Sequence, residues 1–261
     1  MAVSMRGNRR GMMVMPPRRL LSPTLLLLLA LPFASSCDDG GSDAARADNA
    51  LRAAASGDEV LISTDNGLRL RPADGDHITV DDRIDAHWSR HDDRWTLDLG
   101  CADHDGHGCP RMPYVTIPDG AKVTVTARNA GIDVVDVAAA LDVTTVNGDV
   151  TVTHSGQDDA PLRLSTRNGS VRASSVEADG LRATTVNGDV VLQCAAAPTG
   201  VTARTVNGSV DVTVPRDAPA YHVTMGTDNG RTTTDVHAQG ADRNRLMTLS
   251  TVNGDVTARR D

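Results

Sequence analysis

The sequence predicts an all-β protein: a right-handed β-solenoid of about eight coils of ~20 residues, with an irregular N-terminal β cap. Three observations predict this fold. A seven-residue motif recurs at a nearly fixed interval, the residues around it alternate between apolar and polar, and aromatic residues make up only 2% of the chain. A narrow coil is filled by Val, Leu, Ala and Thr and needs few large rings.

The motif is Thr-Thr-Val-Asn-Gly-Asp-Val, which stands unchanged at residues 144–150 and 184–190. With its variants it gives a row of asparagines, separated from the second onward by 21, 19, 20, 22 and 24 residues: Asn66, Asn147, Asn168, Asn187, Asn207, Asn229 and Asn253. A threonine precedes each asparagine by two positions: Thr64, Thr145, Thr166, Thr185, Thr205, Thr227 and Thr251. A fixed period near twenty residues indicates stacked repeats.

Each unit reads as a strand, an Asn-Gly corner, a second strand and a looser return. Period-two alternation makes one face of each strand apolar. In a solenoid, equivalent residues of neighbouring coils lie about 4.8 Å apart. We therefore expect the asparagines to point into the corner as a hydrogen-bonded ladder, with Asn187 buried between Asn168 and Asn207. The expected ladder residues are Asn147, Asn168, Asn187, Asn207, Asn229, Asn253, Thr145, Thr166, Thr185, Thr205 and Thr251.

An antiparallel meander or sandwich of hairpins is the alternative fold, because Asn-Gly also suits a two-residue type I′ turn. The strand parity fits both arrangements. The recurrence of Asn and Thr at every unit favours the solenoid, because stacking rewards identity whereas a hairpin turn would also accept Asp-Gly or Gly-Gly.

Residues 1–36 are predicted to be a signal peptide of the lipoprotein type. Five arginines precede an apolar stretch, and the sequence Ala34-Ser35-Ser36-Cys37 resembles a bacterial lipobox. Cys37 would then carry lipid and anchor the protein to the outer face of the cytoplasmic membrane. Ordinary cleavage near Ser36 would instead give a secreted protein, and the Arg18-Arg19 pair leaves the export route open between general and twin-arginine.

Three further segments follow from composition and pattern. Residues 37–57 are acidic and small, which is typical of a flexible tether. Residues 58–122 interrupt the repeat and predict an N-terminal cap with the first coil, including a β hairpin whose tip lies near Trp88 and Trp95. Residues 123–261 hold the repeat solenoid.

The net charge of the chain narrows the classes of molecule that it can bind directly. Without the five arginines of the signal, the chain has 21 basic and 34 acidic residues, a net charge of −13. This balance argues against nucleic acid and against anionic lipid headgroups as direct partners. We expect contact with the membrane through the lipid anchor only.

Cysteines offer two interpretations. In an exported protein Cys101 and Cys109 are most simply a disulfide. A metal site made by this pair with His104 and His107 is the alternative, but its spacing is not a common zinc pattern. Cys194 is left over and is predicted to be a small buried side chain.

No motif predicts catalysis or a cofactor. His87 and His91 lack the glutamate of a zinc-protease helix, and the sequence holds no G-x-S-x-G and no phosphate loop. Asp149, Asp189 and Asp255 would stack on one edge, where a calcium ladder is conceivable. Serine replaces aspartate in alternate units, so we interpret them as solvated turn residues. We predict no metal and no catalytic residues.

The repeat T-x-N-G-D-V-x-V, the lipobox and the Cys pair before Tyr114-Val-Thr-Ile-Pro-Asp-Gly120 together resemble the DUF4097 family over residues 58–261. This resemblance implies a β-helix-like, non-enzymatic cell-surface module of the adhesin kind, and some family members belong to envelope-stress systems. The expected partner is an envelope protein or a glycan. An accessory subunit of an envelope-stress complex is an alternative. A third class, a polysaccharide-active β-helix enzyme, would need clustered acids with basic residues and often aromatic platforms, in which this chain is poor.

Overall fold

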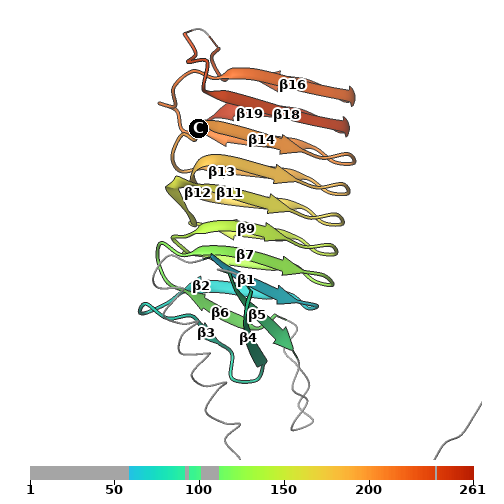
Figure 1. The fold of residues 1–261 in the computed structure, drawn as a ribbon. Helices are drawn as coiled ribbons and strands as arrows, with labels where there is room; N and C mark the ends of the chain where they lie inside the picture. Colours follow the sequence, from blue (N-terminus) through green and yellow to red (C-terminus); the bar gives the residue numbers. More distant parts are fainter. Residues whose placement is uncertain (1–58, 92–93, 101–111, 239) are drawn as a thin grey trace, which may run out of the picture. The chain divides into compact units, whose positions relative to one another are not determined.

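The repeat units pair with one another in parallel and build two sheets (Figure 1). The structure is a computed structural model that describes residues 59–91, 94–100, 112–238 and 240–261. These residues belong to one of the two units into which the chain divides, 38–261. Within these ranges the only regular secondary structure is β-strand. No helix long and apolar enough to cross a membrane is present in the described residues.

Sheet A holds the strand that precedes each corner. In spatial order it runs β4 (Asp85–His91), β5 (Arg94–Gly100), β1 (Glu59–Thr64), β7 (Lys122–Ala127), β9 (Ala140–Thr144), β11 (Gly156–Ser165), β12 (Val171–Thr184), β14 (Gly200–Arg204), β18 (Leu246–Asn253) and β16 (His222–Asn229).

Sheet B holds the strand that follows each corner. Its order is β3 (Thr79–Val80), β6 (Tyr114–Ile117), β2 (Leu68–Pro72), β8 (Ile132–Val135), β10 (Val150–Thr153), β12, β13 (Val190–Cys194), β15 (Val210–Val214), β19 (Val256–Arg260) and β17 (Thr232–Thr234). The long strand β12 contributes its first half to sheet B and its second half to sheet A, and so joins the two sheets.

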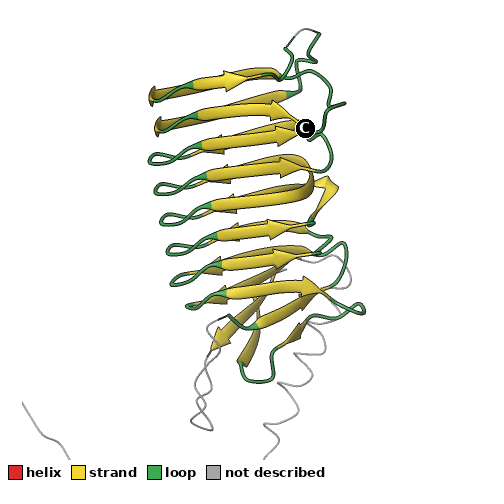
Figure 2. Ribbon diagram, turned by 180° about the vertical axis from the view of Figure 1, so that it is seen from behind, coloured by secondary structure: helices red, strands yellow, loops and turns green. Residues whose placement is uncertain are grey.

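The Asn-Gly segment is a corner between the sheets and not a hairpin turn. For example, β9 pairs with its neighbours in sheet A, and β10, which follows the corner, pairs in sheet B. The corners lie above one another in a column (Figure 2). The antiparallel meander is therefore wrong, because the repeat units pair in parallel with equivalent residues in register.

Aliphatic side chains fill the space between the sheets. Around five of the ladder asparagines, the residues six and four positions before and three and five after are almost completely buried, as in Leu181, Ala183, Val190 and Leu192. These five are Asn147, Asn168, Asn187, Asn207 and Asn253. Burial of these side chains is the main favourable term for each coil. The alternation that the sequence shows is thus an inside-outside pattern, as a coil with one core face requires.

The order of the coils differs from the order of the sequence at both ends. The first coil, β1 and β2, lies between the later strands β5/β6 and β7/β8. Likewise the last coil, β18 and β19, lies between β14/β15 and the earlier pair β16/β17. Figure 1 shows β16 outside β18.

The two ends of the stack are built differently. At one end β4 and β3 pair antiparallel with β5 and β6, so they close the sheet edges there. The strand pair β4–β5 is the hairpin that the sequence predicts near Trp88 and Trp95. At the other end β16 and β17 each have a paired strand on one side only, among the described residues.

Candidate functional site

The corner is the most regular feature of the protein, and its threonines are buried in it. Thr145, Thr166, Thr185, Thr205 and Thr251 are at most 6% exposed. Each hydroxyl donates a 2.8 Å hydrogen bond to a backbone carbonyl of the neighbouring coil, which for Thr185 is that of Gly169. A valine of the same shape could not make this bond, so the structure explains why threonine recurs at this position.

The asparagine side chains form a continuous ladder. Each side-chain nitrogen donates to the side-chain oxygen of the asparagine below at 2.8–2.9 Å, in the spatial order Asn147, Asn168, Asn187, Asn207, Asn253, Asn229. The expectation that these side chains point inward and are buried is wrong: all six are exposed. The inward place is taken by the threonine two residues earlier, and the amides stack on the outside of the corner.

A second exposed ladder runs beside the asparagines. The carboxylate of Asp149 accepts a hydrogen bond from the backbone N–H of Ser170, and the hydroxyl of Ser170 accepts one from the backbone N–H of Asp189. The same two bonds follow in the next coils, from the N–H of Ser209 to Asp189 and from the N–H of Asp255 to the hydroxyl of Ser209. These aspartates therefore bind backbone amides between coils, which gives them a structural task beyond that of solvated turn residues. In the described chain no group of three or more His, Cys, Asp or Glu residues is placed to hold a metal ion.

A glycine follows each asparagine because the corner leaves no space for a side chain. Gly188 has φ +150°, and a Cβ there would overlap the carbonyl oxygen of Gly169 in the next coil. Thr, Asn, Gly and Asp or Ser thus each make one contact with the adjacent coil. Together they fix the spacing and register of the strands that lead into and out of the corner.

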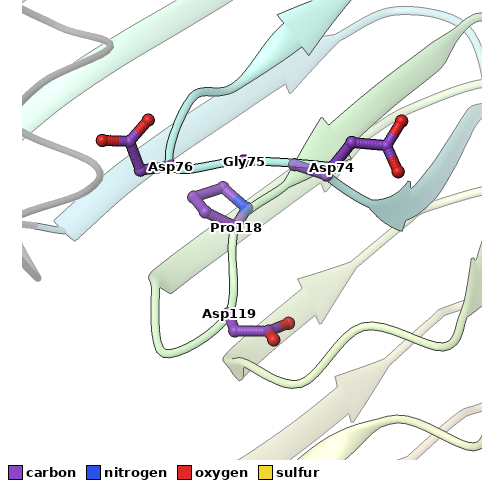
Figure 3. A pocket seen from close by; sticks show the side chains of 6 residues that line it. Asp74, Gly75, Asp76, Pro118 and Asp119 are labelled. Carbon is purple, nitrogen blue, oxygen red and sulfur yellow. The ribbon is translucent and has the colours of Figure 1, made fainter.

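One hollow near the capped end is lined by carboxylates. Asp74, Asp76 and Asp119 surround a space of about 330 Å³ with Gly75 and Pro118. Figure 3 shows that the three carboxylates point away from one another. They do not converge on a common ion position, so this hollow is not an ion site.

A second hollow, of about 370 Å³, lies on sheet A where Glu59, Lys122, Asp142 and Arg163 meet. Burial raises the pKa of Asp142, and the nearby Arg163 opposes that shift. Since opposite charges are mixed here, the hollow favours neither a cation nor an anion.

The exposed Tyr114 lies on sheet B between two arginines. The guanidinium carbons of Arg69 and Arg71 are 5.2 and 5.7 Å from its ring centre, and Arg71 also forms a 2.7 Å ion pair with Asp133. Asp133 thus neutralises Arg71, whereas Arg69 contacts the ring and the hydroxyl of Tyr114.

The predicted sites at Cys37, Cys101 and Cys109 lie outside the described residues, and so do His104 and His107. Cys194 is 3% exposed, and burial raises the pKa of its thiol to about 12. It is a core residue at the end of β13, as the sequence suggests.

The fold and corner define a class of stacked-coil, all-β proteins held together by side-chain ladders. The model of the family Toastrack DUF4097 matches residues 53–259, and the chain belongs to this family. The crystal structure of a putative cell adhesion protein from Clostridium sporogenes ATCC 15579 is similar at 9% identity and a TM-score of 0.37, over 78% of this chain and 93% of that one. No curated protein matches the sequence.

Proposed function

We propose that this protein is a lipid-anchored, non-enzymatic binding module that acts like an adhesin on the outer face of the cytoplasmic membrane. The observation that carries the proposal is the pair of broad sheet faces, whose outward side chains are held in register by the corner ladders. Such faces suit the recognition of an extended protein or glycan. Family membership also supports the proposal, and so does the predicted signal peptide. The proposal further includes a right-handed winding of the chain in about eight coils.

Lipidation at Cys37 is the first test. Cells that produce the protein are supplied with radiolabelled fatty acid, and label should enter the wild type and be absent from Cys37→Ala. Equal label in both, or none in either, would reject the anchor. Peptide mapping without reductant tests the associated disulfide, because two free thiols at Cys101 and Cys109 would reject it.

Attachment is the second test. Cells that display the protein should bind a surface coated with envelope glycans or with partner cells. Cells that produce Cys37→Ala should bind it less, because the variant is released from the membrane. Attachment that does not depend on the protein would reject the adhesin-like role.

An accessory role in an envelope-stress complex is a second candidate, favoured by the open end of the stack. Val223 and Met225 are only half-buried there and line a hollow of about 280 Å³. A photo-crosslinker at Val223, but not one at Thr151 on sheet B, should then capture a recurring membrane protein. Equal capture from both positions would reject this role.

A further inference from the structure

The outward face of sheet A carries a cluster of four arginines, three of which form no ion pair with any described residue. Arg163 and Arg167 lead into the corner from β11, while Arg182 lies on β12 and Arg204 on β14; all four are exposed. Arg163 and Arg182 are register partners on adjacent strands, so their Cα atoms lie about 4.8 Å apart. Arg204 stands one strand further on and two residues along.

The rows around these arginines contain no acidic residue over four adjacent strands. Three registered rows of outward residues cross β11, β12, β14 and β18: Pro161-Gly180-Gly200-Leu246, Arg163-Arg182-Thr202-Thr248 and Ser165-Thr184-Arg204-Ser250. A fourth row, of the residues before the ladder asparagines, is Arg167-Val186-Val206-Val252. Three acids border these rows: Asp142, the register partner of Arg163 on β9; Asp159, which lines the same hollow as Arg163; and Asp228 on β16, beside the end of the fourth row.

Sheet B shows the opposite arrangement. Three of its arginines form ion pairs at 2.7–2.9 Å: Arg71 with Asp133, Arg172 with Asp149 and Arg259 with Asp211. On sheet A, by contrast, Arg167, Arg182 and Arg204 form no ion pair with any described residue. These three unpaired guanidinium groups form a local positive field inside an acidic protein, and at physiological salt that field extends about 8 Å. Arg163 stands at the border of the field, beside Asp142.

We propose that this face binds an acidic polysaccharide whose carboxylates pair with Arg167, Arg182 and Arg204. Guanidinium groups bind carboxylates with two parallel hydrogen bonds. The hydroxyls of Ser165, Thr184, Thr202, Thr248 and Ser250 can bond sugar hydroxyls between the arginines. The exposed Val186, Val206 and Val252 offer apolar surface to the C–H faces of sugar rings.

Other polyanions fit this face less well. Single-stranded nucleic acid binds through bases stacked on aromatic side chains, and the four rows contain none. The small residues Gly180 and Gly200 in the first row keep the surface flat, which suits an extended chain lying across the strands. This inference rests on the proposed binding function and names the ligand class for one face.

The test uses the intact protein in detergent and polygalacturonate as the probe. The variant Arg182→Thr/Arg204→Thr copies residues that adjacent coils already carry in these rows, Thr202 and Thr184, so the fold is preserved. The control Arg231→Ser/Arg243→Ser removes two exposed positive charges elsewhere. We expect the first variant to weaken binding at least about tenfold, because two charge-assisted contacts are lost, and the control to bind like the wild type.

Fully methyl-esterified polygalacturonate should not bind, and added salt should weaken binding of the free acid. Equal losses in both variants would show a general charge effect and overturn the site. Binding of polyphosphate or anionic vesicles without binding of polygalacturonate would overturn the polysaccharide assignment. If cells attach through the wild-type protein and equally well through Arg182→Thr/Arg204→Thr, this inference alone is refuted. If the wild-type protein itself mediates no attachment, the proposed function is refuted.

Discussion

At the residue scale, the buried threonine hydroxyl is the contact that distinguishes this corner from an aliphatic one. Thr185→Val keeps the shape of the side chain and removes the 2.8 Å bond to the Gly169 carbonyl. We expect a loss of about 1–3 kcal/mol in the free energy of unfolding, because a buried acceptor loses its donor. Thr202→Val, on the outward face of β14, should change it by less than about 0.5 kcal/mol. Urea unfolding of both variants measures the difference, and equal values would contradict the role of the hydroxyl.

The exposed asparagine ladder should contribute less than the buried threonine. Asn187→Asp removes the donor to Asn168 and places a carboxylate next to its side-chain oxygen, whereas the bond from Asn207 is kept. Because water reaches these groups, we expect a loss of about 0.5–1.5 kcal/mol. The same urea titration measures it. A much larger loss would mean that the ladder is shielded from solvent.

The corner glycine should tolerate substitution least. At Gly188 an alanine meets both a positive φ and the backbone of the next coil. We expect Gly188→Ala to lower stability by at least about 1–3 kcal/mol from backbone strain alone. Gly200→Ala, with no atom within 4 Å of the added Cβ, is the control and should be neutral or slightly stabilising. Similar thermal midpoints for the two variants would contradict this account.

At the element scale, the inserted position of β18 can be tested directly by cross-linking. Thr202 and Thr248 are register partners, about 4.8 Å apart, which is within the Cα range of a disulfide. Thr224, which would be the neighbour of Thr202 if coils stacked in chain order, is two strands away, at about 9.6 Å. We expect the pair Thr202→Cys/Thr248→Cys to oxidise readily and Thr202→Cys/Thr224→Cys to stay reduced. Mass spectrometry of the oxidised proteins decides, and the reverse result would restore the order of the sequence.

The sequence predicts the coils well and their order poorly, and one physical reason explains both. Thr at minus two, Asn at zero and Gly at plus one specify how a coil contacts its neighbour, so the motif predicts stacking. Because every coil carries the same motif, any coil can stack on any other. The motif therefore does not determine which two coils are neighbours. The longer separations after Asn207 and Asn229 are where the chain skips a place and returns.

The direction of the asparagines and the arginine cluster were missed for a related reason. Period-two parity puts Thr185 and Asn187 on the same face, so the alternation alone predicts an inward asparagine. The strand ends at Thr184, and the corner turns the chain before Asn187, which leaves Thr185 buried and Asn187 exposed. The arginine cluster needs residues 163, 182 and 204 to be aligned by the register of three strands. Overall net charge, which argues against polyanions, averages this face with the acidic remainder of the chain.

At the scale of the whole molecule, the insertion of β18 between two coils should make local stability run against the order of the sequence. β18 has strands on both sides, whereas β16 is paired only with β18 among the described residues and lies at the open end with Val223 and Met225 half-buried. An edge strand has hydrogen bonds and core contacts on one side only, so we expect β16 to open first.

Opening β18 breaks hydrogen bonds and core contacts on two sides, including those of the fully buried Met247. We expect backbone amides of residues 246–253 to exchange with deuterium at least about tenfold more slowly than those of residues 222–229, as local opening energies follow buried contacts. Hydrogen exchange followed by mass spectrometry measures both segments in one experiment. Faster exchange in 246–253 would show that insertion between two coils does not protect β18.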